Sequence, residues 1–254
     1  MKRLDFHTNN WTGPAGRTLQ QGVKWDGTDF YVYQADKVPG GENLVIRRYD
    51  SNLTYRGYLT IPNGGHGSTT GVIRINPTTS RHILPAMSRG IRVVDYQVGN
   101  PKPVNNHLIS AVGHCSAVSC NNGRNRLSVR KGGSTQTVNW FNRDDVLAGK
   151  KVESLLKFSF KTPSRSTFQG HYNWNDSDFF HWETDGVPRG SANYRTWIDE
   201  YKNGKHVRKL DTTSLVNRKA EPEGLMGYQA GLYAVKKAFT SGNVKLHLVA
   251  IQIQ

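Results

Sequence analysis

Two stretches of the sequence, 21–31 (QGVKWDGTDFY) and 169–180 (QGHYNWNDSDFF), share one pattern and decide the fold. Each begins with Gln-Gly, reaches a tryptophan, crosses a turn rich in small polar residues and resumes with two aromatic residues. Gln21 and Gln169 are 148 residues apart, and the spacing grows to 149 at Asp29 and Asp178 because the second copy holds one extra residue. Such recurrence indicates a fold built from copies of one supersecondary unit.

The residues around these copies predict an all-β protein. Apolar residues alternate with others in short runs such as 71–75 and 245–251, which is the pattern of half-buried strands. Turns such as Lys202-Asn203-Gly204-Lys205 separate the runs and have the chemistry of β-hairpins. We expect a helix of one or two turns only near Asp144–Ala148.

The spacing of the units predicts a β-propeller. Unit starts fall near residues 21, 66, 114, 169 and 221, at intervals of 45, 48, 55 and 52 residues. A four-stranded propeller blade takes about 40–50 residues. We therefore predict a single-domain, five-bladed β-propeller over 1–254, its ring closed by a strand at Arg3–His7 that pairs with the last blade around Val244–Ile253. A β-sandwich with long loops is the competing architecture.

Composition restricts the class of protein. Lys and Arg number 34 against 19 Asp and Glu, giving a formal net charge of +15, and 36% of residues are hydrophobic, which is enough for a core. No apolar run approaches the roughly 18 residues that span a bilayer, and Met1–His7 is followed by no hydrophobic segment, so neither a membrane span nor a conventional signal peptide is predicted. We expect Cys115 and Cys120 to be reduced, with a short-loop disulfide as the alternative.

Three motifs resemble a known family of five-bladed propellers. They are the Gln-Gly unit opening, the stretch Gly65-His66-Gly67-Ser68-Thr69-Thr70-Gly71, and Glu221-Pro222-Glu223-Gly224-Leu225. The family includes the bacteriocin helveticin J, TagC-type proteins of teichoic-acid operons and receptor-binding domains of staphylococcal phages. The resemblance implies a module that recognises an anionic Gram-positive cell-wall glycopolymer. It also implies a protein that is secreted or released without a signal peptide and acts at the bacterial surface.

The unit openings predict where a ligand binds. Innermost strands line the axis of a propeller, so polar residues at their openings should meet at one end of it. Amides, imidazoles and carboxylates hydrogen-bond sugar hydroxyls, and Tyr172, His171 and Tyr228 follow the openings as candidates for stacking on a sugar ring. The predicted ligand-binding set is Gln21, His66, His114, Gln169, His171, Glu221, Glu223 and Tyr228. The alternative is that the polar members only satisfy backbone groups. A bound metal ion stays open, no cofactor is predicted, and Trp25 and Trp174 are expected to pack within their blades.

The basic residues are unevenly distributed along the chain. Residues 74–131 hold nine Lys or Arg and one acid, which predicts a positive face that attracts polyanions. The predicted polyanion patch is Arg74, Arg124, Arg126, Arg130 and Lys131. Wall polymer is the favoured partner because of the resemblance. Nucleic acid is the alternative polyanion, but the sequence has no RNA-recognition, OB, KH or helix-turn-helix signature.

An enzyme is the alternative of a different class. A glycosidase or lyase would use Glu221, Glu223 and His66 as its acid, base and polar partner. The sequence has no Gly-x-Ser-x-Gly elbow, His-Glu-x-x-His, phosphate-binding loop or dinucleotide fingerprint. The prediction therefore favours binding over catalysis.

Overall fold

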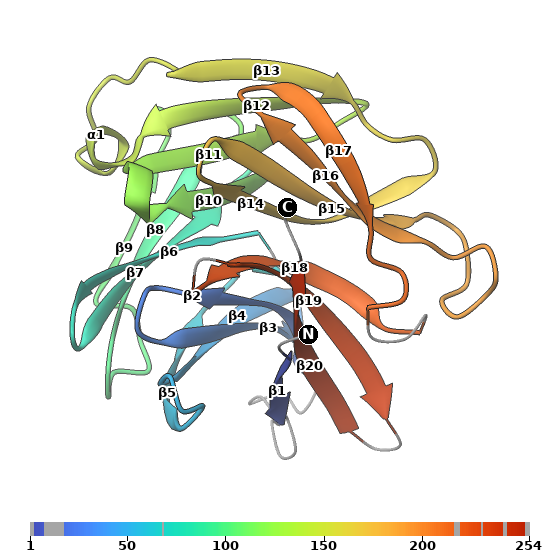
Figure 1. The fold of residues 1–254 in the computed structure, drawn as a ribbon. Coiled ribbons are helices and arrows are strands. Elements are labelled where there is room, and N and C mark those ends of the chain that lie inside the picture. The colour runs from blue at the N-terminus through green and yellow to red at the C-terminus, as the bar shows by residue number, and fades with distance from the viewer. Residues whose placement is uncertain are drawn as a thin grey trace.

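Five antiparallel sheets of four strands each surround one axis, so the chain is a five-bladed, all-β propeller (Figure 1). The computed structural model describes residues 3–7, 18–67, 69–215, 219–229, 231–240 and 243–251. The single-domain propeller predicted from the repeat is confirmed, and the β-sandwich is excluded. None of the described residues forms a helix that is long and apolar enough to cross a membrane.

Each blade runs from an inner strand at the axis to an outer strand at the rim. The first blade contains β2 (Thr18–Trp25), β3 (Phe30–Val38), β4 (Gly41–Tyr49) and β5 (Tyr55–Ile61). The second contains β6 (Gly71–Asn76), β7 (Thr79–Pro85), β8 (Ile91–Gln97) and β9 (Asn105–Ile109). The third contains β10 (Ala117–Asn121), β11 (Arg126–Lys131), β12 (Thr135–Asn142) and β13 (Leu156–Lys161). The fourth contains β14 (Ser166–Trp174), β15 (Ser177–Thr184), β16 (Thr196–Lys202) and β17 (Lys205–Asp211). The fifth contains β18 (Glu221–Tyr228), β19 (Gly231–Thr240), β20 (Asn243–Ile251) and β1 (Arg3–His7).

The sequence repeat corresponds to a repeated irregularity in the inner strands. The pairing of β2 with β3 shifts register at Gln21, and the pairing of β14 with β15 shifts register at Gln169. The pairing of β18 with β19 shifts in the same way at Glu223. A glycine follows each of these three residues. The two Gln-Gly segments therefore occupy equivalent inner strands, and Glu223-Gly224 is a third copy of the same bulge.

The N-terminal strand lies at the edge of the last blade. β1 pairs antiparallel with β20, with Arg3 opposite Val249 and His7 opposite Lys245. This is the partner strand that the sequence predicted, although residues 252–253 of the predicted range lie outside the described residues. That the pairing holds the ring closed stays a prediction.

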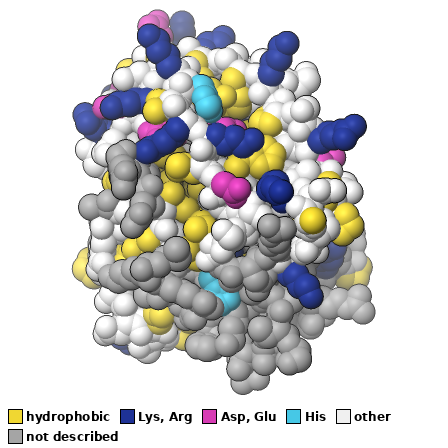
Figure 2. Space-filling model, turned by 45° about the vertical axis from the view of Figure 1, so that its right-hand side comes forward, with side chains coloured by type: hydrophobic (Ala, Val, Ile, Leu, Met, Phe, Trp, Pro, Cys, Tyr) yellow, Lys and Arg dark blue, Asp and Glu magenta, His cyan; other side chains and the backbone are white. Residues whose placement is uncertain are grey.

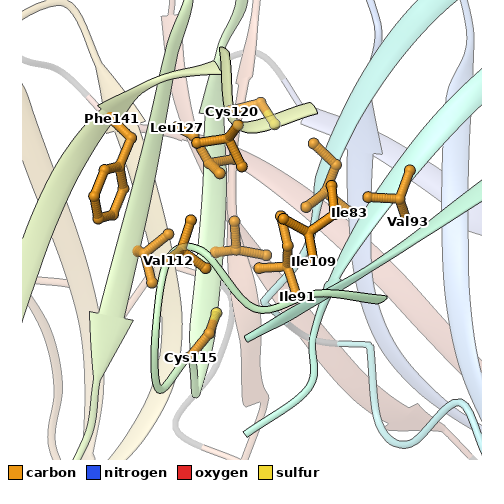
Figure 3. Close-up of a cluster of buried hydrophobic side chains, with 12 residues drawn as sticks. Ile83, Ile91, Val93, Ile109, Val112, Cys115, Cys120, Leu127 and Phe141 are labelled. Carbon is orange, nitrogen blue, oxygen red and sulfur yellow. The ribbon is translucent and has the colours of Figure 1, made fainter. Parts of the chain in front are cut away.

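The apolar core is divided among the interfaces between blades. Among the described residues, one buried cluster lies between each pair of neighbouring blades. Between the second and third blades, Ile83, Ile91 and Val93 face Leu127 and Phe141 (Figure 3). These hydrophobic side chains hold neighbouring blades against one another.

Two short helical segments lie in the third blade. α1 (Arg143–Leu147) is the predicted helix, and the side chain of its N-cap residue Asn142 accepts a hydrogen bond from the Asp145 backbone N–H at 3.1 Å. A 3₁₀ turn, Asn122–Arg124, follows β10 directly and was not predicted. Cys115 and Cys120 are both free and buried, so the expected reduced form is found and the alternative disulfide is not.

Candidate functional site

A cavity of about 330 Å³ opens at one end of the propeller axis. Its wall is formed by the ends of four inner strands and by the first residues of β6, so all five blades contribute. One representative from each blade is Trp25, Val72, Asn121, Trp174 and Tyr228. A concave site of this size on a symmetry axis is where propellers and other closed folds commonly bind small groups.

Aromatic side chains make up much of the wall of this axial pocket. Trp25 and Trp174, which end β2 and β14, are half-buried, and Tyr228 ends β18. The Trp25 ring meets the Tyr228 ring edge-on at 5.0 Å between centroids. Tyr172 reaches across from β14 and its hydroxyl lies against Gly227 of β18, where any larger residue would clash. The aromatic faces are thereby fixed around the opening.

Lys24 of β2 extends to the inner strand of the neighbouring fifth blade. Its ammonium group donates a hydrogen bond of 2.8 Å to the carbonyl oxygen of Leu225 on β18, and it lies 5.9 Å from the centre of the Tyr172 ring. The side chain is only 3% exposed, and burial lowers the pKa of Lys24 to about 7. Arg124, in the 3₁₀ turn, is exposed at the rim and lies 3.6 Å from Asp176. The pocket therefore has one buried and one exposed cationic group.

The one carboxylate among the described residues that line the pocket is already engaged. Asp26 Oδ1 accepts hydrogen bonds from the backbone N–H groups of Thr28 and Asp29, both at 2.9 Å. Its Oδ2 accepts from the Tyr31 hydroxyl at 2.9 Å and from Arg74 at 3.4 Å. Asp26 thus organises the turn between β2 and β3, and no carboxylate is left over in the described wall for acid/base chemistry.

Three of the predicted ligand residues meet at the opposite end of the axis. The Gln169 side-chain amide donates to Glu183, and Arg189 bridges Glu183 at 3.1 Å and Glu221 at 2.6 Å. Lys237 pairs with Glu221 at 2.8 Å and also with Glu223. Gln169, Glu221 and Glu223 do converge as predicted, but as members of a closed ion-pair network. Glu223 is 3% exposed, so its carboxylate does not face solvent.

The environment shifts the pKa values of two carboxyl groups in this network, Glu223 and Glu221, in opposite directions. Burial raises the pKa of Glu223 to about 8, against the opposing attraction of Lys237. Burial also opposes ionisation of Glu221, but Lys237 and Arg189 outweigh it and lower the pKa of Glu221. Such a pair is chemically suited to an acid and a base. Its enclosure by Arg189 and Lys237 favours a structural role instead.

Three other predicted residues do not join this network. His66 lies in the loop before β6, is mostly exposed, and pairs with Glu42 of the first blade at 2.5 Å. His114 is exposed in the loop before β10. Gln21 is buried at the bulge of β2. His66 therefore does not stand beside Glu221 and Glu223 in the arrangement that the enzyme alternative requires.

His171 and Tyr228 lie in two very different environments. His171 is fully buried between the third and fourth blades, where its Nε2 lies 2.8 Å from Asp178 and 3.2 Å from the Ser128 hydroxyl. Burial also lowers the pKa of His171. The prediction that its ring stacks on a sugar is corrected, because no ligand reaches it while the blades are packed. Tyr228 does line the axial pocket, at the opposite end of β18 from Glu221.

The predicted polyanion patch is not one surface. β11 joins two regions, with Arg124 and Arg126 at the end near the axial pocket and Arg130 and Lys131 at the far end. Arg130 is buried over the Phe168 ring at 3.6 Å, and burial lowers the pKa of Arg130 to about 10. Arg74 is held by Asp29 at 2.8 Å. On the face that Figure 2 shows, basic and acidic side chains both occur.

Sequence reasoning missed several residues of the axial pocket. Lys24, Asn121 and Gln229 were not selected, and Trp25 and Trp174 were assigned to packing alone. The two tryptophans do pack against the clusters between blades, and they also line the pocket. The repeat contained a usable signal, because equivalent positions in two inner strands must lie at the same end of the axis.

Comparison with known proteins supports the fold. No protein-family model and no curated protein matches the sequence. Among solved structures, the tail fiber of Staphylococcus aureus phage P68 superposes with a TM-score of 0.73 at 16% identity, over 92% of this chain and 50% of the fiber chain. The GH43B protein of a Bacteroides ovatus xyloglucan locus superposes with a TM-score of 0.55 at 13% identity, over 99% of this chain and 55% of that chain. A GH32 β-fructofuranosidase from Bombyx mori superposes with a TM-score of 0.53 at 8% identity, over 96% of this chain and 62% of the enzyme chain. The chain spans about half the length of the tail fiber, and at these identities the likeness shows a five-bladed propeller fold.

Proposed function

We propose that this propeller is a bacteriocin-like or receptor-binding module that recognises an anionic glycopolymer of the Gram-positive cell wall, and that the polymer binds in the axial pocket. The similarity in fold to a tail fiber of a Staphylococcus aureus phage supports a role at a bacterial surface. The motifs that resemble helveticin J and the phage receptor-binding domains point to the same kind of target.

The composition of the axial pocket carries this proposal. Trp25, Trp174 and Tyr228 offer aromatic surface to sugar or polyol units. The Asn121 amide nitrogen already donates to Asn173 and to the Asn175 carbonyl oxygen, both at 3.1 Å, so Asn121 offers its side-chain oxygen as an acceptor for hydroxyls. Lys24 and Arg124 supply positive charge, while Asp26 is neutralised by its own hydrogen bonds and by Arg74. A site with aromatic, amide and cationic groups suits a polymer that alternates neutral rings with negative charges.

The glycosidase alternative has less support. Glycoside hydrolysis uses two carboxyl groups that flank the scissile bond, about 5–10 Å apart. The described wall of the axial pocket offers only Asp26, and the pair Glu221 and Glu223 is tied to Lys237 at the other end of the axis. The likeness to glycosidase structures is one of fold alone.

Nucleic acid is likewise less favoured as the partner. A duplex or a single strand is usually held along a continuous basic groove. Here Arg124 and Lys131 lie at opposite ends of the third blade, and Arg130 is buried between blades. The cationic groups near the pocket fit a short negatively charged unit better than a long backbone.

Sedimentation with purified walls tests the proposal. Intact staphylococcal or lactobacillar walls are compared with the same walls from which teichoic acid has been extracted, and the supernatant is analysed for released sugar and phosphate. We expect binding to intact walls, its loss on stripped walls, and no released product. Equal binding to both preparations contradicts recognition of the anionic polymer. Product that accumulates with time establishes the enzyme instead.

A further inference from the structure

The ammonium group of Lys24 is a buried cation to which no carboxylate is paired among the described residues. Its hydrogen-bond partner there is the Leu225 carbonyl oxygen, at 2.8 Å. An ammonium group has three donor hydrogens, so this contact accounts for one of them. Buried lysines are normally paired with an acid, because removing an unpaired charge from water is costly. The fold maintains this costly arrangement at the floor of an open pocket.

The groups around Lys24 explain why it has no internal counter-ion. Tyr172 of β14 and Cys120 of β10 face it across the axis, and burial raises the pKa of each to about 12, so both are neutral. Burial also lowers the pKa of His171, which precedes Tyr172 in β14. Asp26 faces the same pocket, but its oxygens accept from Thr28, Asp29, Tyr31 and Arg74. The environment of Lys24 therefore lacks the negative charge that a bound anion would supply.

We infer that Lys24 is the anion-binding group of the axial pocket and that it takes one phosphate group of the ligand, while Trp25 and Trp174 hold the neighbouring sugar or polyol unit. This inference rests on the proposed function and specifies its chemistry. A phosphate oxygen accepts charge-assisted hydrogen bonds from an ammonium group, and these strengthen where water is excluded. Arg124 at the rim lies where the next charge along a polymer would enter.

A phosphate at Lys24 also changes the protonation of the pocket. Because burial lowers the pKa of Lys24 to about 7, part of the free protein is unprotonated at pH 7.5. A negative charge bound beside the ammonium group raises this pKa again, so binding at pH 7.5 takes up protons. A lysine that merely blocks the channel does not produce this uptake.

The test is titration calorimetry with a synthetic glycerol-phosphate oligomer, with inorganic phosphate and uncharged glycerol as separate ligands. Lys24→Met removes the charge and keeps a similar length, and Lys131→Met removes one charge from an exposed residue at the far end of β11. We expect Lys24→Met to weaken oligomer binding about ten- to hundredfold and Lys131→Met to change it less than about twofold. Unchanged affinity in a folded Lys24→Met protein overturns the inference.

Further measurements identify the class of ligand, and some use only the wild type, so that they do not depend on the folding of a variant. Inorganic phosphate that competes with the oligomer supports a phosphate subsite, whereas equally tight binding of a uronic-acid oligomer overturns the phosphate assignment. Wild-type titrations at pH 7.5 in two buffers of different ionisation enthalpy measure proton uptake directly, and zero uptake contradicts the role of Lys24. If Lys24→Met binds intact walls as the wild type does, only this inference fails. If the wild type does not distinguish intact from stripped walls, the proposed function fails.

Discussion

Gly170 of β14 lies so close to Gly224 of β18 that a Cβ atom built on Gly170 would come within 2.6 Å of the Gly224 Cα atom. Each glycine directly follows the bulge residue of its strand, Gln169 in one case and Glu223 in the other. The glycines of the pairs Gln169-Gly170 and Glu223-Gly224 therefore have a structural cause. Where inner strands of neighbouring blades touch near the axis, only a residue without a side chain fits.

Gly170→Ala should destabilise the propeller markedly. The added methyl group meets backbone atoms of Gly224 and Leu225, which cannot move aside as a flexible side chain does. Overpacking of this kind costs about 1–3 kcal/mol, and we expect the upper part of that range. The measurement is the free energy of unfolding in urea. Gly123→Ala, where the nearest atom is 3.9 Å away, is the matched control. Equal stability of the two variants would refute close contact between β14 and β18.

The general architecture could be predicted because it depends on local pattern and repeat length. The Gln21 and Gln169 segments mark equivalent inner strands, and alternation with hairpin turns marks the others. Each predicted unit start lies within five residues of the first residue of an inner strand. These features are set by backbone pairing and by burial between blades, both of which leave a period in the sequence.

The site could be predicted only in part, because side-chain partners leave no such period. Glu221 and Glu223 look like ligand residues in the sequence, and nothing local shows that Lys237 from the next strand neutralises them. Arg130 looks like a member of a basic surface until Phe168 covers it. Lys24 lies within the repeat, where an alternating position gives no sign that its side chain is buried against Leu225 of the neighbouring blade.

Removal of residues 1–7 should lower the melting temperature. β1 supplies the outermost strand of the blade that also contains the C-terminal strands, and its loss leaves the edge of β20 unpaired. We expect a decrease of several degrees by calorimetry, since each 1 kcal/mol of lost stability lowers the melting temperature of a domain of this size by about 2–4 °C. Removal of residues 1–2 alone, which precede β1, is the control. A protein without residues 1–7 that melts with the wild type argues against closure by this strand.

Positive charge near the axial pocket should contribute more to wall binding than positive charge elsewhere on the protein. Arg124→Gln and Lys131→Gln remove one positive charge each from exposed residues at opposite ends of the third blade. We expect Arg124→Gln to weaken wall binding about threefold and Lys131→Gln to have little effect. Binding by the wild type should also weaken as salt shortens the Debye length from about 10 Å at 0.1 M to about 3 Å at 1 M. Equal losses in the two variants would mean that only total charge matters.

Two buried lysines should make the free energy of unfolding rise with pH just above neutrality, whereas the raised pKa of Glu223 acts in the opposite direction up to about pH 8. Burial lowers the pKa of Lys236 to about 7 from its ordinary 10.5, and its ammonium group donates to the Thr196 hydroxyl at 2.6 Å. Between these two values the unfolded chain binds a proton that the folded chain lacks, so the free energy of unfolding increases with pH. Lys24 contributes in the same direction.

Lys236→Met should remove part of this dependence. Urea unfolding at pH 7 and pH 8.5 gives the slope for each protein, and we expect a smaller rise in the variant than in the wild type. Glu223 and the buried cysteines, whose raised pKa values act in the opposite direction, contribute equally to both proteins and so cancel in the comparison of the two slopes. Lys131→Met, at an exposed position, should leave the slope unchanged. A variant whose slope equals that of the wild type contradicts an effect of Lys236.

Wall binding by Trp174→Ala tests most directly whether the axial pocket is the recognition site. Trp174 lines the pocket, whereas Tyr58, an exposed aromatic residue on the outer strand β5, lies outside its wall. The dissociation constant for intact walls is measured for Trp174→Ala, Tyr58→Ala and the wild type, after melting curves have confirmed that each is folded. We predict a loss of about tenfold or more for Trp174→Ala and less than about twofold for Tyr58→Ala. Wild-type affinity in folded Trp174→Ala, or an equal loss in both variants, would contradict binding in the axial pocket.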